Sequence, residues 1–130
     1  MIWKNLYANF QVMRYNADGT YAWANTKTIN TGSAWAYSGP DGGLYIVYVN
    51  GGYGLSAILI DQDGNDVWKE PVSVVKETIG TSSYTTPPTV VPDDNGGLML
   101  TYRVLKNYGG YIACNHITRD GKVYEESLLA

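Results

Sequence analysis

Short apolar runs separated by glycine-rich reversals dominate the chain. The clearest example is residues 41–68, in which an Asp-Gly-Gly turn at 41–43 leads into six consecutive apolar or aromatic residues at 44–49. Such a run is typical of a strand covered on both faces, because a half-exposed strand would alternate. A glycine-rich turn, the run 55–60 and an Asp-Gly turn at 63–64 follow. The pattern predicts a meander of short antiparallel strands.

The meander recurs along the chain. Asp-Gly pairs followed by an aromatic residue occur at 18–23, 63–68 and 120–124. Sliding the copies onto one another gives columns that stay apolar: Phe10, Leu55 and Ile112; Val12, Ala57 and Cys114; Tyr15, Ile60 and Ile117. A period of about 50 residues made only of short strands is typical of propeller blades. We therefore expect an all-β fold of propeller-type blades, with a small β-sandwich as the alternative.

The repeats also predict where the elements begin and end. We expect one β-repeat domain over residues 1–130, with a part blade at 1–32, a blade at 33–80 and a blade at 81–130. Besides the two runs above, the predicted strands are residues 6–15, 20–28, 33–38, 67–75, 98–104, 111–118 and 122–130. The polar, Ser/Thr-rich segment 76–86 is predicted to be a loop between blades.

The repeat unit resembles the β-propeller repeats of bacterial secreted and surface proteins. In those repeats an acidic-Gly-Gly turn leads into an apolar strand ending in Trp or Tyr, and a later strand ends in Asp-Gly with a Trp a few residues beyond. Residues 41–48 and 63–68 match this pattern, whereas Glu125 stands where the third copy would carry the Trp. The resemblance implies a non-catalytic repeat module at the cell surface of a bacterium or outside the cell.

The number of repeats predicts association. The chain holds roughly two and a half blades, whereas closed propellers have about 4 to 8. An open stack of so few blades would leave apolar faces and bare strand edges in water. We therefore expect a homo-oligomer, most simply two chains closing one ring, and a function as a self-associating scaffold or protein-interaction domain.

Composition narrows the partners. Nine basic and 12 acidic residues give a net charge of −3 without a basic cluster, which argues against a nucleic-acid partner. No stretch approaches the ~20 apolar residues of a membrane span. The single Cys114 cannot form an internal disulfide, so cysteine usage leaves the compartment open.

Three features could carry chemistry, and each has a simpler interpretation. The acidic segment 61–66 looks like part of a calcium loop, but Asp and Gly also build ordinary turns, so we expect no metal and no cofactor. The Asp-Gly-x-x-x-Trp element resembles the Asp-box of sialidase propellers, which would need clustered arginines; the chain has Arg14, Arg103 and Arg119. His116 is the only histidine, so a catalytic triad would depend on it alone. We expect no enzyme.

Aromatic residues offer the alternative function. The chain has 12 Tyr and four Trp but one Phe. Flat aromatic faces near Asn, Asp and Ser are what sugar rings bind, which makes a lectin-like carbohydrate-binding module the alternative function. The candidate ligand-binding residues are Trp23, Trp35, Tyr53, Trp68 and Tyr108. A Trp that recurs once per blade can equally be a packing anchor between blades.

Overall fold

The described residues of the chain are all β. The structure, a computed structural model, describes residues 2–4, 9–31, 33–49, 54–75, 88–106 and 109–125. Within them, one short 3₁₀ turn, η1 (Pro40–Gly42), is the only helical element. The strands are β1 (Ile2–Lys4), β2 (Phe10–Val12), β3 (Lys27–Ile29), β4 (Ala34–Ser38), β5 (Leu44–Val49), β6 (Leu55–Ile60), β7 (Val72–Val75), β8 (Thr89–Pro92), β9 (Leu98–Lys106), β10 (Gly109–Ile117) and β11 (Val123–Glu125). The all-β prediction is confirmed.

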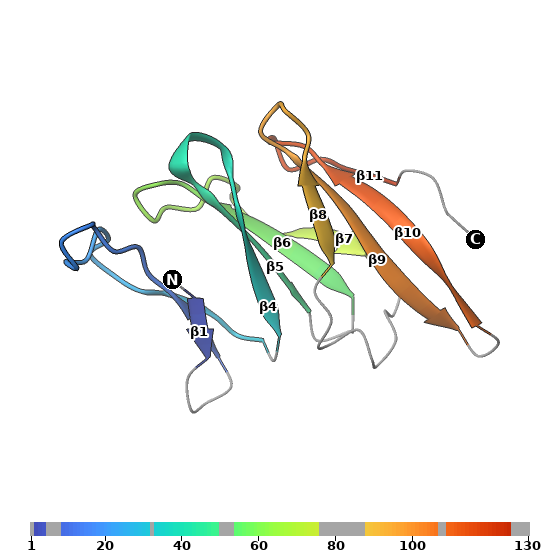
Figure 1. Cartoon of the computed structure of the whole chain (residues 1–130), viewed down its shortest axis with the longest axis horizontal. Coiled ribbons are helices and arrows are strands. Elements are labelled where there is room, and N and C mark those ends of the chain that lie inside the picture. Colours follow the sequence, from blue (N-terminus) through green and yellow to red (C-terminus); the bar gives the residue numbers. More distant parts are fainter. Residues whose placement is uncertain are drawn as a thin grey trace.

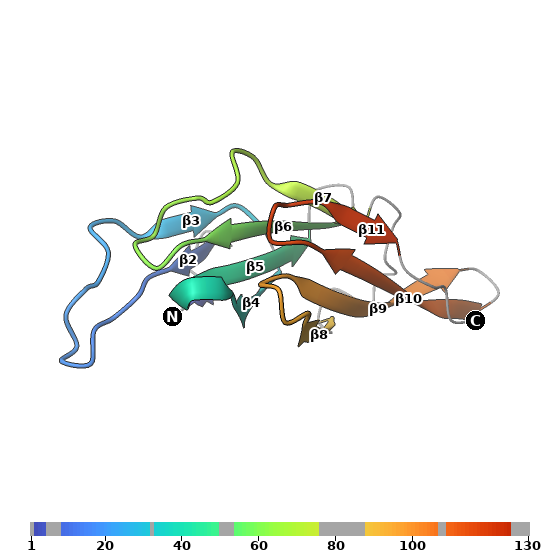
Figure 2. The same ribbon diagram turned by 90° about the horizontal axis from the view of Figure 1, so that it is seen from above.

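The strands form three antiparallel sheets in which sequence neighbours pair. Sheet 1 has the order β1-β2-β3, sheet 2 the order β4-β5-β6-β7 and sheet 3 the order β8-β9-β10-β11. Figure 1 shows the three sheets side by side in chain order, and Figure 2 shows the same row from above. Open sheets of this kind fit propeller-type blades or a small β-sandwich, the two architectures expected from the sequence.

Two apolar clusters hold the row together, one at each junction between sheets. The cluster between sheets 1 and 2 contains Val12, Trp23, Ile46 and Ile60. The cluster between sheets 2 and 3 is larger, and its buried members are Tyr45, Val47, Leu55, Ala57, Leu59, Val74, Leu98, Leu100 and Ile117. Strand β5 contributes alternate residues to both clusters because successive side chains leave a strand on opposite faces. The predicted two-sided burial of this strand is therefore confirmed.

The two predicted outer strands are wrong in their first halves. Residues 22–25 and 67–70 form bends, and regular pairing begins only at β3 and β7. The reason is the same in both copies: each bend carries the tryptophan of the repeat, Trp23 or Trp68, and turns it toward the neighbouring sheet. Among the described residues, the predicted strand 6–15 reduces to β2. The predicted loop 76–86 lies outside the described residues.

Candidate functional site

Each junction is closed by a tryptophan that binds the Asp-Gly turn of the next sheet. The indole N–H of Trp23 donates to the carbonyl oxygen of Gln62 at 2.8 Å. The indole N–H of Trp68 donates to the carbonyl oxygen of Arg119 at 2.9 Å. In both cases the acceptor directly precedes the Asp-Gly pair of the following repeat. We call this arrangement the tryptophan anchor.

A glycine makes room for each anchor. Gly64 and Gly121 adopt φ of +90° and +84°, in the left-handed region that favours glycine. A Cβ built on Gly64 would lie 2.8 Å from Cδ2 of Trp23, and one on Gly121 would lie 3.1 Å from Cε2 of Trp68. The glycine of the repeat therefore serves both the turn and the close approach of the indole.

Carboxylates of Asp61 and Asp18 fix the Asp-Gly turns of the second and first copies. Oδ1 of Asp61 accepts the backbone N–H groups of Asp63 and Asn65, each at 2.9 Å. These bonds lower the pKa of the Asp61 carboxyl, with the bond from Asn65 the largest cause. In the first copy, the hydroxyl and backbone N–H of Thr20 lower the pKa of Asp18 in the same way. This geometry supports the turn interpretation of the acidic segment over a calcium loop.

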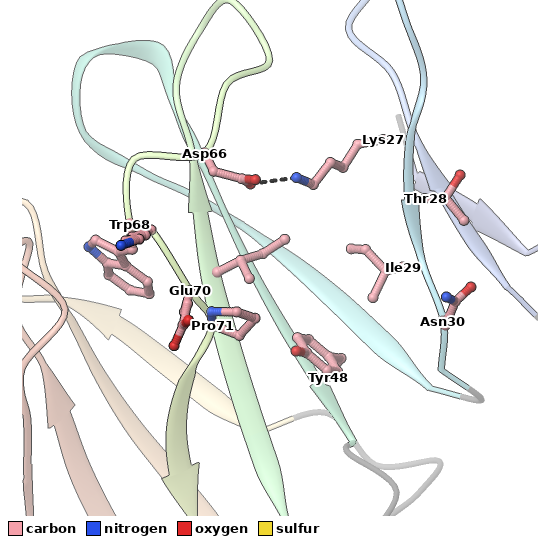
Figure 3. Close-up of a pocket in the computed structure, with 11 residues that line it drawn as sticks. Lys27, Thr28, Ile29, Asn30, Tyr48, Asp66, Trp68, Glu70 and Pro71 are labelled. Atoms are coloured by element: carbon pink, nitrogen blue, oxygen red, sulfur yellow. Dashed lines mark hydrogen bonds and ion pairs between the residues drawn. The ribbon is translucent and has the colours of Figure 1, made fainter.

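The main pocket lies at the junction of sheets 1 and 2. It has a volume of about 260 Å³ and is lined by Lys27, Thr28, Ile29, Asn30, Tyr48, Ile58, Asp66, Trp68, Lys69, Glu70 and Pro71. Figure 3 shows Lys27 and Asp66 facing each other across it from the two sheets, and their ion pair is 2.5 Å long. The pocket therefore combines a charged pair, a carboxamide and an aromatic ring.

Tyr48 supplies the aromatic ring inside this pocket. Burial raises the pKa of its phenol, while a hydrogen bond with Ser56 opposes that rise, so the hydroxyl stays protonated at neutral pH. The indole of Trp68 instead lies on the far side of the sheet 2 ribbon from Lys27, where it forms the anchor to sheet 3 (Figure 3). The polar groups that a ligand would meet here are the ammonium of Lys27, the carboxamide of Asn30 and the carboxylate of Glu70.

A second hollow lies at the turn-bearing rim of sheets 2 and 3. Its volume is about 200 Å³, and its lining residues are Pro40, Asp41, Leu59, Ile60, Asp61, Gln62, Asp63, Val67 and Arg119. The guanidinium of Arg119 forms an ion pair with Asp41 across it. Both partners are largely exposed, so this pair contributes little stability.

The histidine lies on β10 and binds a neighbouring turn. Nε2 of His116 lies 2.6 Å from Oδ2 of Asp93, whose Oδ1 accepts the backbone N–H groups of Asn95 and Gly97. The hydrogen bond from His116 is the largest cause of the lowered pKa of Asp93. The pair fixes the 93–97 turn, and the carbonyl of Gly96 in that turn accepts the hydroxyl of Tyr45 from sheet 2.

The arginines considered for sialidase-type chemistry lie at different junctions. Arg14 donates to the carbonyl of Gln62 at 3.1 Å, beside the anchor of Trp23. Arg119 binds Asp41 at the other junction. The side chain of Arg103 lies outside the described part of the structure. Sequence inspection missed Tyr48 and the Lys27–Asp66 pair, because no repeat column marks a contact between different copies.

The three candidate aromatic residues that the structure describes do not gather in one place. Trp23 is buried under the second turn, and Trp35 on β4 packs against the larger apolar cluster. Trp68 borders the main pocket, but its indole N–H donates to the carbonyl of Arg119 in the anchor. Tyr53 and Tyr108 lie outside the described residues.

Comparison of the chain with protein-family models, with curated proteins and with solved structures finds no match. Within the described residues, no helix is long and apolar enough to cross a membrane. The same residues contain no group of three or more His, Cys, Asp or Glu side chains placed to hold a metal ion.

Proposed function

We propose that the chain is a non-catalytic, propeller-type repeat module that acts as a self-associating scaffold. Its sheets are blade-like units that bury apolar faces against one another. A further sheet could therefore pack against either end of the row. The observation that carries this proposal is that five of the six large hydrophobic side chains described as exposed, all except Val67, lie at the two ends of the row.

The outer face of sheet 3 is the larger of these ends. Cross-strand pairing places Val91, Met99, His116 and Tyr124 in one row on the face turned away from sheet 2, and Ile112 follows on the same face of β10. Val91, Ile112 and Tyr124 are 51–57% exposed. The opposite face of the same strands is buried against sheet 2. A second copy that presents the same face would cover this patch in a two-fold symmetric contact.

The test is the mass in solution. We expect light scattering to give a mass above the 14.3 kDa of one chain, rising with concentration. Ile112→Lys adds a charge at an exposed position and should return the protein to a monomer, whereas Thr28→Lys, on sheet 1, should leave the mass unchanged. A folded wild-type monomer at every concentration would contradict self-association.

A second candidate function is carbohydrate binding, and the main pocket favours it. Tyr48, Asn30 and Glu70 provide an aromatic ring, a carboxamide and a carboxylate within one hollow of about 260 Å³. Tryptophan fluorescence with a glycan panel tests this function, because Trp68 borders the pocket. Binding should be lost in Asn30→Ala and kept in Tyr124→Ala, which lies at the far end of the row. No response to any glycan would remove this candidate.

A further inference from the structure

The first Asp-Gly turn is an anchor site without its tryptophan. Gly19 has φ of +87°, as Gly64 and Gly121 have +90° and +84°. A Cβ built on Gly19 would meet no described atom within 4 Å, whereas the two equivalent positions each meet an indole. Ala17 directly precedes the Asp-Gly pair, as Gln62 and Arg119 do in their copies. This turn lies at the outer end of the row (Figure 1), and no described indole covers its glycine.

The side chains beside this turn are also more exposed than their counterparts in the other two copies. Tyr15 occupies the column of Ile60 and Ile117, each of which pairs across the start of its turn. Those two isoleucines are 0% exposed because a preceding sheet covers them, but Tyr15 is 39% exposed. Tyr21 is 68% exposed and packs against Tyr15 with the two rings tilted at 55° and their centroids 5.3 Å apart. These residues, with the turn at Ala17 and Gly19, form what we call the open socket.

An identical copy lacks the side chain that would fill the open socket. In a head-to-tail contact, the third repeat of one copy would meet the first repeat of the next. The third repeat carries Glu125 where the other two carry Trp23 and Trp68. A carboxylate has no N–H to donate to the Ala17 carbonyl and no flat ring to cover Gly19. Trp23 and Trp68 themselves are already bound within the chain.

We propose that the open socket binds a tryptophan-bearing β-sheet of another protein chain, one that presents an indole as Trp23 and Trp68 do within this chain. The indole N–H would donate to the carbonyl of Ala17, and its ring would cover Gly19 and the two exposed tyrosines. This proposal names the partner at one end of the scaffold and rests on the proposed function. It separates the two ends: the sheet 3 face binds a copy, and the sheet 1 end binds a different, tryptophan-bearing sheet.

The test supplies the missing side chain. Glu125→Trp gives identical copies an anchor for the open socket, and the resulting contact is head-to-tail, which builds either a closed ring or an open row of copies. We expect self-association at least about tenfold tighter than that of the wild type, with masses above those of the wild type at equal concentration. Glu125→Ala removes the charge without adding an indole and should behave as the wild type does.

Blocking the socket completes the test. Gly19→Asn tolerates the left-handed turn but fills the space above it, and Tyr21→Glu adds a charge at the rim. Either change in the Glu125→Trp background should abolish the added association and leave the wild-type mass. Growth that survives both changes, or no growth in Glu125→Trp, would overturn the proposal without touching self-association through sheet 3. Wild-type association that Gly19→Asn abolishes would show that a plain copy fills the socket, which also overturns it.

Discussion

The two junctions share the tryptophan anchor but differ in what surrounds it. Between sheets 2 and 3, the hydroxyls of Tyr37 and Tyr45 donate to carbonyls of sheet 3, and Asn115 donates back to the carbonyl of Val74. Between sheets 1 and 2, the apolar cluster is smaller, and the space beside it is the main pocket. The anchor therefore recurs at both junctions. We call the junction of sheets 2 and 3 the filled junction, because its hollow lies at the rim, and the junction of sheets 1 and 2 the hollow junction.

Removing the anchors should give the largest effects and should break the two junctions unequally. Trp23→Ala and Trp68→Ala each remove a large packed ring, which costs about 3–5 kcal/mol of unfolding free energy. We expect Trp23→Ala to release sheet 1 while sheets 2 and 3 stay protected, because the other bonds across that junction, from Arg14 to Gln62 and from Lys27 to Asp66, are exposed to solvent. Trp68→Ala should leave sheets 2 and 3 joined through the remaining bonds. Hydrogen exchange resolved by strand checks this, and equal loss of protection in both variants would contradict it.

Removing the hydrogen bonds found only at the filled junction should give the second-largest loss of stability. Asn115 is buried, donates to Val74 at 2.8 Å and accepts the hydroxyl of Tyr102 at 2.8 Å. Asn115→Leu removes both of these buried hydrogen bonds and should cost about 1–3 kcal/mol in urea unfolding. Thr28→Val, on the exposed face of sheet 1, is the matched control and should cost far less. A near-neutral Asn115→Leu would show that packing alone holds the junction.

Features that depend on residues close together in the chain could be predicted from the sequence, whereas contacts between different sheets could not. The apolar columns and Asp-Gly turns predicted an all-β chain and the two-sided burial of β5, because both depend on residues close together in the chain. The bends before β3 and β7 were missed, because residues 20–28 and 67–75 have strand-like composition and only the neighbouring sheet shows where Trp23 and Trp68 must point. The pocket was missed for the same reason, since Lys27 and Asp66 belong to different repeats.

Acid should weaken the filled junction because it protonates Asp93, which fixes the 93–97 turn that binds Tyr45. The folded pKa of Asp93 lies below its ordinary 3.8, chiefly because of the bond from His116. The stabilisation is therefore present above pH 3.8 and is lost as the pH falls through the lowered pKa of the folded protein. Asp93→Asn should flatten this part of the stability profile between neutral and acidic pH. An unchanged slope in that variant would exclude Asp93 as its source.

The ion pair of the hollow junction should have the smallest effect. Lys27 and Asp66 are 2.5 Å apart, but their side chains are 27% and 48% exposed, so solvent screens the attraction. Lys27→Met should cost about 0–1 kcal/mol, and the difference from the wild type should shrink in high salt. The double variant with Asp66→Asn isolates the coupling between the two charges. A loss well above this range that persists in salt would mean that the pair, rather than the Trp23 anchor, holds sheet 1 on sheet 2.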